Sequence, residues 1–469
     1  MQRRQLLQAS VVGATALTAS GRLLAAPAGS PRFLMVFLRG GYDALSLLVP
    51  VPSQGSYYRE VRPNIAVVAT SASPADKPGA GTVSSPSPGP LPLNNDWGLH
   101  PALQASLMPL VAKRQASFVP FAGTDDLTRS HFETQDSIEL GQPLTGRRDF
   151  GSGFLNRLAG LVQGAPGTAA GSDAIAFTDQ VPLVLRGELG VANLSLKVEP
   201  KAGDEKLRAA LAGMYRDHPL QDRVAGAFEV RQEAARQIAG VAPAVSAVPG
   251  APGASGSSRA SGASGATGAA PVAVAGGMPG MGAAGAAAGM AGEQVSANRG
   301  AINAKGFELE ARRIARLMRE RYALGFVDVG GWDTHVGQGA ATGYLASRFE
   351  ELGRGLAAYA DELGEAAWRN TVVVVISEFG RTARENGNRG TDHGHGSVHW
   401  VLGGSLAAGP VVGEQQTFEA KTLFQNRDLP VLNEYRAVLG GLLTRQFALS
   451  PAQLDMVFPG ARAKDMGLI

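Results

Sequence analysis

Short, uninterrupted apolar runs alternate along the chain with longer segments in which apolar residues recur every three or four positions. The runs have the composition of strands buried on both faces of a sheet, and we expect them at residues 33–38, 65–69, 116–120, 323–329, 371–376 and 398–402. The spaced segments predict amphipathic helices over residues 101–113, 307–321 and 345–363. Because helices alternate with buried strands, we predict an α/β fold, a three-layer α/β/α arrangement with a mostly parallel central sheet.

Two segments break this pattern. Residues 71–92 are rich in Ser, Pro and Gly and predict an exposed loop. Residues 241–297 consist almost entirely of Ala, Gly, Ser, Pro, Val and Met, so they have too little apolar surface to bury and are predicted to be disordered. We interpret them as an insertion in a single domain that spans residues 29–469, because neither flank looks complete alone. A linker between two domains is the alternative.

Residues 1–28 have the order of a signal peptide: a charged start, a weakly apolar stretch, and small residues before a cleavage point. Arg3 and Arg4, followed by two leucines, resemble the twin-arginine type. This pattern predicts the twin-arginine export machinery as a partner and the periplasm or the exterior as the destination. A basic tail or an uncleaved anchor is the alternative. The apolar stretch is short for a membrane span and no later run reaches that length, so we expect no stable span in the mature chain.

Composition narrows the possible partners and the possible chemistry. The 469 residues include 43 basic and 40 acidic ones, a formal net charge of +3. Arg3, Arg4 and Arg22 account for this excess, so the chain after residue 28 is balanced and gives no reason to expect a nucleic-acid partner. There is no cysteine, which excludes disulfides, thiolate metal sites and a cysteine nucleophile.

Histidines and carboxylates gather in three motifs of the chain's last third, at residues 328–335, 377–382 and 390–396. Two motifs directly follow predicted strands and the third lies just before another, and α/β folds place ligand sites at strand ends. Imidazole and carboxylate without thiolate suit one or two divalent metal ions, with zinc, manganese and calcium indistinguishable. With an aspartate after the first strand included, the candidate metal ligands are Asp43, Asp328, Asp333, His335, Glu378, Asp392, His393 and His395. Singly, each motif has an ordinary alternative as a turn, a helix cap or a polar loop.

Groups that suit the binding and attack of an ester accompany these motifs. Arg381 closely follows Glu378 and is a natural clamp for an anionic ester. Thr128 and Ser130 offer hydroxyls next to His131, so either hydroxyl is a candidate nucleophile and these residues join Arg381 as candidate catalytic groups. The same segment is also typical of a helix start, with Thr128 or Ser130 as its cap.

Six stretches together resemble a bacterial family known as domain-of-unknown-function family 1501: residues 37–43, 98–101, 129–133, 327–335, 377–382 and 390–395. That family is similar to the alkaline phosphatase–sulfatase superfamily, and residues 390–393, Gly-Thr-Asp-His, look like the metal-binding loop of its phosphopentomutases. The resemblance implies an alkaline phosphatase-like domain in which metal is held by the first-strand aspartate and late Asp and His motifs. It also implies an exported hydrolase of phosphate or sulfate esters, with a hydroxyl nucleophile and a small anionic substrate. A non-catalytic, metal-containing binding protein of the same fold is the alternative.

Overall fold

The computed structural model describes residues 29–51, 55–69, 87–162, 173–196, 205–218 and 297–469, with a few helical positions between 221 and 228. The predicted signal peptide at 1–28 lies outside the described residues, as do most of the predicted loop at 71–92 and all of the predicted insertion except the buried Ala297. None of the helices in this described part combines the length and the apolar character needed to cross a membrane.

The large central sheet has the strand order β12-β5-β11-β10-β1-β9-β6-β7, with β8 paired to β9 outside that path. Its strands are β1 (Arg32–Leu38), β5 (Ala116–Gly123), β6 (Ala174–Ala176), β7 (Ala192–Asn193), β8 (Ile302–Asn303), β9 (Leu324–Gly330), β10 (Thr371–Ser377), β11 (Ser397–Gly403) and β12 (Asn433–Glu434). Among the described pairs, β11 runs antiparallel to β10 and β5, and the others are parallel. The predicted α/β fold with a mostly parallel sheet is confirmed, with one reversed strand.

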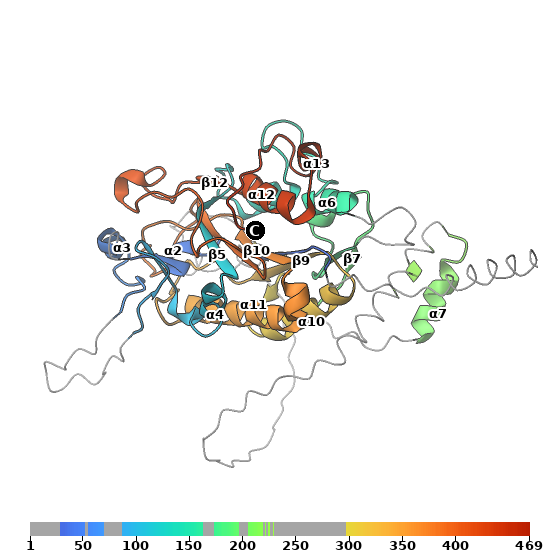
Figure 1. The fold of residues 1–469 in the computed structure, drawn as a ribbon, viewed down its shortest axis with the longest axis horizontal. Coiled ribbons are helices and arrows are strands. Elements are labelled where there is room, and N and C mark those ends of the chain that lie inside the picture. The colour runs from blue at the N-terminus through green and yellow to red at the C-terminus, as the bar shows by residue number, and fades with distance from the viewer. Residues whose placement is uncertain are drawn as a thin grey trace, which may run out of the picture.

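The strands β9, β1 and β10 lie in the middle of the sheet because their residues are largely apolar on both faces. Every residue of the three strands is buried. β1 pairs in parallel with both neighbours, so that Phe33 lies opposite Val372 and Leu324. Helices cover both faces, which gives three layers (Figure 1). One face packs against α10 (Phe307–Glu320) and α11 (Tyr344–Trp368), and the other against α6 (Phe154–Val162), α12 (Tyr435–Phe447) and α13 (Pro451–Val457).

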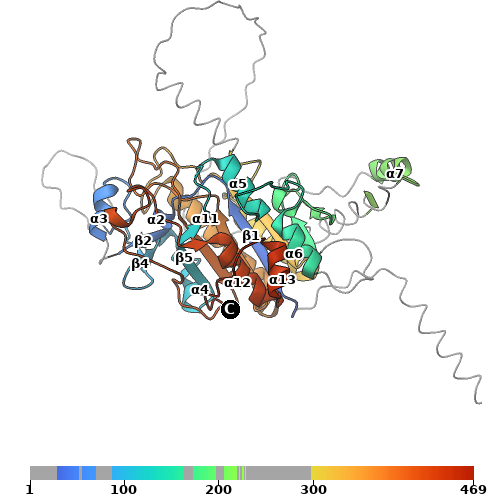
Figure 2. The same ribbon diagram turned by 90° about the horizontal axis from the view of Figure 1, so that it is seen from above.

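The remaining described elements are short. A small sheet of β2 (Leu48–Pro50), β4 (Trp97–Leu99) and β3 (Leu91–Pro92) lies beside α2 (Ala44–Leu47) and α3 (Gly55–Val61), at one end of the molecule (Figure 2). The others are η1 (Pro101–Leu103), α4 (Met108–Ala112), α5 (His131–Leu140), η2 (Leu183–Leu185), α7 (Glu205–Met214) and η3 (Ala420–Thr422).

Two predicted elements differ from the structure. The predicted strand at 65–69 is wrong: the backbone N–H groups of Asn64 and Ile65 donate to the Glu385 side chain rather than to a neighbouring strand. The predicted helix at 101–113 is divided into η1 and α4, and Pro109 in the first turn of α4 favours a helix start over a helix interior. In α11, the predicted end at residue 363 coincides with a break, because Gly364 has a non-helical φ of 76°.

A buried ion pair ties the end of β1 to the surrounding loops. The Asp43 carboxylate accepts hydrogen bonds from both terminal nitrogens of Arg62, at 2.6 and 2.9 Å, and from Ser46 and Gln338, at 2.7 Å each. Burial alone would raise the pKa of Asp43, but the Arg62 guanidinium and these hydrogen bonds lower it below its usual value. The pair therefore contributes stability that is present above the ordinary carboxyl pKa and is lost as the pH falls through the lowered one.

We predict that Arg62→Met destabilises the domain by about 3–5 kcal/mol at pH 7, because it leaves the buried Asp43 carboxylate without its cation. The measurement is the free energy of unfolding from a urea titration. The difference from the wild type should shrink as the pH falls towards about 4, where an uncompensated Asp43 protonates.

Arg445→Met is the matched control, because the Arg445–Asp465 pair is half-exposed on both sides. It should cost no more than about 1 kcal/mol. Equal losses in the two variants would show that the Asp43 pair does not stabilise this part of the fold.

Candidate metal centre

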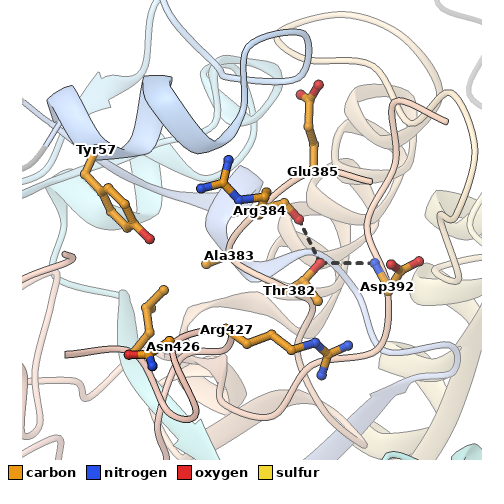
Figure 3. Close-up of a pocket in the computed structure, with 9 residues that line it drawn as sticks. Tyr57, Thr382, Ala383, Arg384, Glu385, Asp392, Asn426 and Arg427 are labelled. Atoms are coloured by element: carbon orange, nitrogen blue, oxygen red, sulfur yellow. Dashed lines mark hydrogen bonds between the residues drawn. The ribbon is translucent and has the colours of Figure 1, made fainter. Parts of the chain in front are cut away.

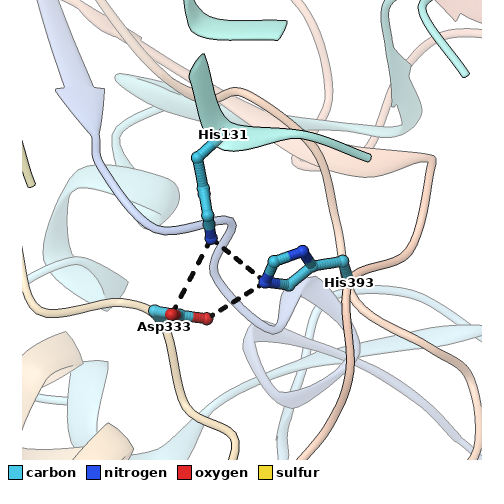
Figure 4. Close-up of side chains that lie close together, drawn as sticks. All are labelled: His131, Asp333 and His393. Atoms are coloured by element: carbon cyan, nitrogen blue, oxygen red, sulfur yellow. Dashed lines mark hydrogen bonds and ion pairs between the residues drawn. The ribbon is translucent and has the colours of Figure 1, made fainter. Parts of the chain in front are cut away.

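Three residues from distant parts of the chain meet at the carboxyl end of the central strands. His131 begins α5, Asp333 follows β9, and His393 lies in the loop between β10 and β11. Their potential ligand atoms all lie within 4.8 Å of one another (Figure 4). The Nε2 atoms of His131 and His393 are 3.0 Å apart, and they lie 3.7 and 3.5 Å from the two oxygens of Asp333. This group has the residue types and spacing of a metal site.

His335 lies at the rim of the same cluster. Its Nε2 atom is 3.0 Å from an Asp333 oxygen and 3.1 Å from Nε2 of His393. The site therefore gathers three imidazoles and one carboxylate.

Hydrogen bonds on the far side of each imidazole fix its orientation. Nδ1 of His131 lies 2.7 Å from a Glu378 oxygen, and Nδ1 of His393 lies 3.0 Å from the backbone carbonyl of Arg129. A carboxylate and a carbonyl only accept hydrogen bonds, so we assign the proton of each neutral ring to Nδ1. Each Nε2 then presents its lone pair to the cluster, which is the form in which imidazole binds metal.

The third imidazole has the same arrangement. Nδ1 of His335 lies 3.3 Å from an oxygen of Asp392, so its Nε2 atom also faces the cluster as a lone pair. Lone pairs that converge at such short distances repel one another unless a proton or a cation lies between them. A nitrogen of Arg381 lies 3.4 Å from Nε2 of His335 and partly compensates this one lone pair. Three neutral imidazoles and a carboxylate, without thiolate, are a donor set that suits a divalent cation such as zinc or manganese. The residues present thus fit a metal ion.

In the metal-free chain a proton takes the place of the cation. Burial lowers the pKa of His131, but hydrogen bonds to Asp333 and Glu378 outweigh this effect and raise it to about 9. Burial alone would raise the pKa of Glu378, whereas its contacts with His131 and Gln135 lower it to about 2. Hydrogen bonds from the three imidazoles likewise lower the pKa of Asp333 despite its burial. The carboxylates of Asp333 and Glu378 are therefore both ionised at neutral pH. Metal binding to His131 must release this proton, so affinity should fall as the pH is lowered.

Glu378 lies behind His131 rather than in the cluster. It is fully buried directly after β10, and its carboxylate accepts hydrogen bonds from the backbone N–H of Gly40 and from Gln135, at 2.8 and 2.9 Å, and from Ser377 at 2.8 Å. These donors fix the carboxylate, and the carboxylate in turn fixes the His131 ring. The structure therefore places Glu378 as a residue that positions His131, a candidate ligand.

Arg381 is buried and its guanidinium donates entirely to groups of the protein. Its nitrogens bond to the backbone carbonyls of Gly40, Gly41 and Thr391 and to the carboxylate of Asp333. The side chain is fully buried, so it orients Asp333 instead of facing an open anion site as the sequence predicted. Gly40 allows this close approach: it has a φ of 121°, and a Cβ there would lie 2.6 Å from the backbone nitrogen of Asp333.

With this geometry established, comparison with known proteins places the chain in a family. The family described as "Protein of unknown function (DUF1501)" matches residues 30–458. The chain belongs to the DUF1501 family. No curated protein and no solved structure matches it.

Several residues predicted as ligands of this DUF1501 chain lie away from the cluster. Asp43 is held by Arg62, and Asp328 accepts a hydrogen bond from Nε of Arg39 at 3.2 Å. Burial raises the pKa of Asp328 to about 6. The His395 ring packs against Phe424 with centroids 4.9 Å apart, and burial lowers its pKa to about 4. The sequence pattern named these residues by type, but their partners direct them elsewhere.

The two candidate hydroxyl nucleophiles occupy the helix-start arrangement. Ser130 is the N-cap of α5, and its hydroxyl accepts from the backbone N–H of Glu133 at 3.5 Å. The Thr128 hydroxyl accepts from the backbone N–H of Ser130 and lies 3.3 Å from the hydroxyl of Thr134. The described contacts thus assign both hydroxyls to the start of the helix.

The supporting role of Gln135 was not anticipated from the sequence. His131 and Gln135 are four residues apart on α5, so they lie on one face of the helix, and both bond to the same Glu378 oxygen. That spacing was the available signal. It was missed because nothing in the sequence pairs α5 with the end of β10.

We predict that purified protein carries about one divalent ion per chain and that Glu378→Gln weakens metal affinity about 10- to 100-fold, because His131 loses its orienting carboxylate. Elemental analysis and a competition titration with a chelator measure content and affinity. His395→Gln, a change outside the cluster, should retain wild-type affinity in folded protein. Folded wild-type protein without metal, or equal losses in both variants, would contradict this centre.

Proposed function

We propose that the chain is an exported, metal-dependent hydrolase of phosphate or sulfate esters. The observation that carries this proposal is the convergence of three imidazole Nε2 atoms on the Asp333 carboxylate at the carboxyl ends of the central strands. A divalent ion held there would polarise an ester and lower the pKa of a bound water. The three-layer fold and the motif resemblance support membership of the alkaline phosphatase-like superfamily.

The cluster is closed on one side and open on the other, as a site for a small substrate requires. The side chains of His131 and Asp333 are only 1% and 4% exposed, whereas those of His335, His393 and Asp392 are 14%, 16% and 54% exposed. A substrate would approach from the side of these last three residues. The closed side excludes water, which strengthens electrostatic contacts at the reacting centre.

In this proposal the attacking oxygen comes from water, because the hydroxyls of Thr128 and Ser130 form hydrogen bonds at the start of α5. Water adds to phosphorus or sulfur, the bond to the alcohol oxygen breaks, and the alcohol leaves with a proton. The chain's own residues hold the centre in place: Glu378 orients His131, and Arg381 orients Asp333. The substrate class is a small anionic ester.

Because the hydroxyls of Thr128 and Ser130 are bound at the helix start, the described part of the site has no evident side-chain nucleophile. This favours a second candidate function, a non-catalytic binding protein that holds a metal. An activity assay separates the two candidates. A panel of aryl phosphates, phosphodiesters and aryl sulfates covers the proposed substrate class.

We predict that metal-loaded wild-type protein hydrolyses at least one ester of the panel and that His393→Ala lowers kcat/KM about 100-fold or more. A chelator should abolish turnover and added metal should restore it. Thr128→Ala and Ser130→Ala should each stay within about threefold of wild type, because helix-start changes act mainly on stability. Turnover of no ester by metal-loaded protein would support the binding-protein candidate, and loss of turnover in either alanine variant would identify a hydroxyl nucleophile.

We also propose that residues 1–28 direct the chain through the twin-arginine machinery to the periplasm. That machinery carries folded proteins, so the metal site would be formed before export. The Arg3-Arg4 pair supports this proposal, as does the charge balance of the remaining chain.

We predict that replacing Arg3 and Arg4 together by lysine leaves the uncleaved precursor in the cytoplasm, because the machinery recognises the arginine pair. Cell fractionation and immunoblotting measure the distribution. Arg22→Lys, which preserves the pair, should be exported and cleaved normally. Export of the double variant at the wild-type level would argue against this pathway.

A further inference from the structure

A pocket of about 250 Å³ includes Asp392, which lies at the open side of the candidate metal cluster. Figure 3 shows the residues that line this pocket. Its walls come from α3, the loop after β10, and the segment after η3. The lining residues that matter here are Tyr57, Thr382, Arg384, Asp392, Asn426 and Arg427. In Figure 3, Tyr57 and Asp392 lie on opposite sides of this space.

The pocket and the cluster share a wall. Asp392 lines the pocket and also contacts Nδ1 of His335 at 3.3 Å. Arg427 lines the pocket and donates to the backbone carbonyl of His393 at 2.7 Å. A molecule held at the open side of the cluster would therefore lie directly beside the pocket.

The acidic groups of the pocket are already occupied by donors of the protein. Glu385 accepts from the backbone N–H groups of Asn64 and Ile65, and Asp392 accepts from Asn386 at 3.0 Å. Their negative charge is thus partly satisfied before any ligand arrives.

The cationic groups retain donor capacity. Arg384 is exposed, and within the described part of the chain its guanidinium makes no hydrogen bond or ion pair. Arg427 is 40% exposed, and two of its nitrogens donate hydrogen bonds, one to Asp428 and one to the His393 carbonyl. Arginine matches carboxylate, sulfate and phosphate oxygens with paired N–H groups. The N–H donors that remain available in this pocket therefore favour an anion.

We propose that the pocket binds the alcohol portion of the ester and selects an alcohol of monosaccharide size that bears a second anionic oxygen group. This proposal rests on the proposed hydrolase function. The size follows from the volume, because a cavity of about 150 Å³ holds a benzene ring and a larger one holds a substituted six-membered ring. The anionic group pairs with Arg384. Tyr57 and Asn426 supply a hydroxyl and an amide for the remaining oxygens of the ring.

Binding of the released alcohol is the first test, because it does not depend on turnover. Calorimetry on metal-loaded full-length protein would compare glucose, glucuronate, glucose 6-sulfate and glucose 6-phosphate. The charged sugars should bind about tenfold more tightly than glucose, the discrimination expected of one charge-assisted contact. Arg384→Gln should remove this preference. Arg59→Gln, which deletes the same charge on α3 outside the pocket lining, should retain it.

The metal-deficient His393→Ala variant separates binding in the pocket from direct binding to the metal. It should keep the preference for at least one charged sugar. The comparison among carboxylate, sulfate and phosphate identifies which anion the pocket prefers. Equal affinity for glucose and all charged sugars, or a preference that survives Arg384→Gln, would overturn the proposal.

A kinetic comparison connects the pocket with the reaction. The ratio of kcat/KM for glucuronate 1-phosphate to that for glucose 1-phosphate should fall about tenfold in Arg384→Gln and persist in Arg59→Gln. If both esters are hydrolysed and the ratio does not change, the pocket proposal is wrong and the hydrolase function stands. If neither these esters nor the aryl panel is hydrolysed, the hydrolase function is wrong, and with it the reading of the pocket as an alcohol site.

Discussion

The buried guanidinium of Arg381 holds the site in one arrangement. It joins the glycine turn after β1, the loop that carries Asp333 and the loop that carries His393, through Gly40, Gly41 and Thr391. A charge this deeply buried is tolerated only when it is paired, and its partner is the carboxylate of the cluster. The position of Asp333, and through it the spacing of the imidazoles, therefore depends on a residue that does not itself face the open site.

Most of the fold was predictable because the central strands can be recognised from their local apolar sequence. The sequences of β1, β9 and β10 are largely apolar and alternate with amphipathic helices. Their strand conformation and their burial therefore follow from the pattern. The reversal of β11 did not follow, because an apolar run carries no direction. The strand predicted at 65–69 was wrong for a related reason, since burial does not by itself imply strand pairing. Ile65 and Val67 are buried, but the backbone of this stretch forms no strand.

The candidate site was predictable by residue type and only in part by role. The late motifs contain Asp333, His335 and His393, and the structure brings these together with His131. Asp43 and Asp328 look like the same kind of residue in sequence, yet each is paired with an arginine from another segment, Asp43 with Arg62 and Asp328 with Arg39. Sequence spacing does not reveal such pairings. It is the arginine, supplied by another segment, that decides which carboxylate stays available.

The reversed direction of β11 places part of the candidate site on a single connection. Because β11 starts at the edge where β10 ends, residues 378–396 leave and re-enter the sheet at one place, without a crossover helix. That single connection carries the candidate ligand His393, the residues Glu378 and Arg381 that orient His131 and Asp333, and one wall of the pocket. A change in this one stretch would therefore alter one side of the cluster and one wall of the pocket together, while His131 and Asp333 stay on other elements.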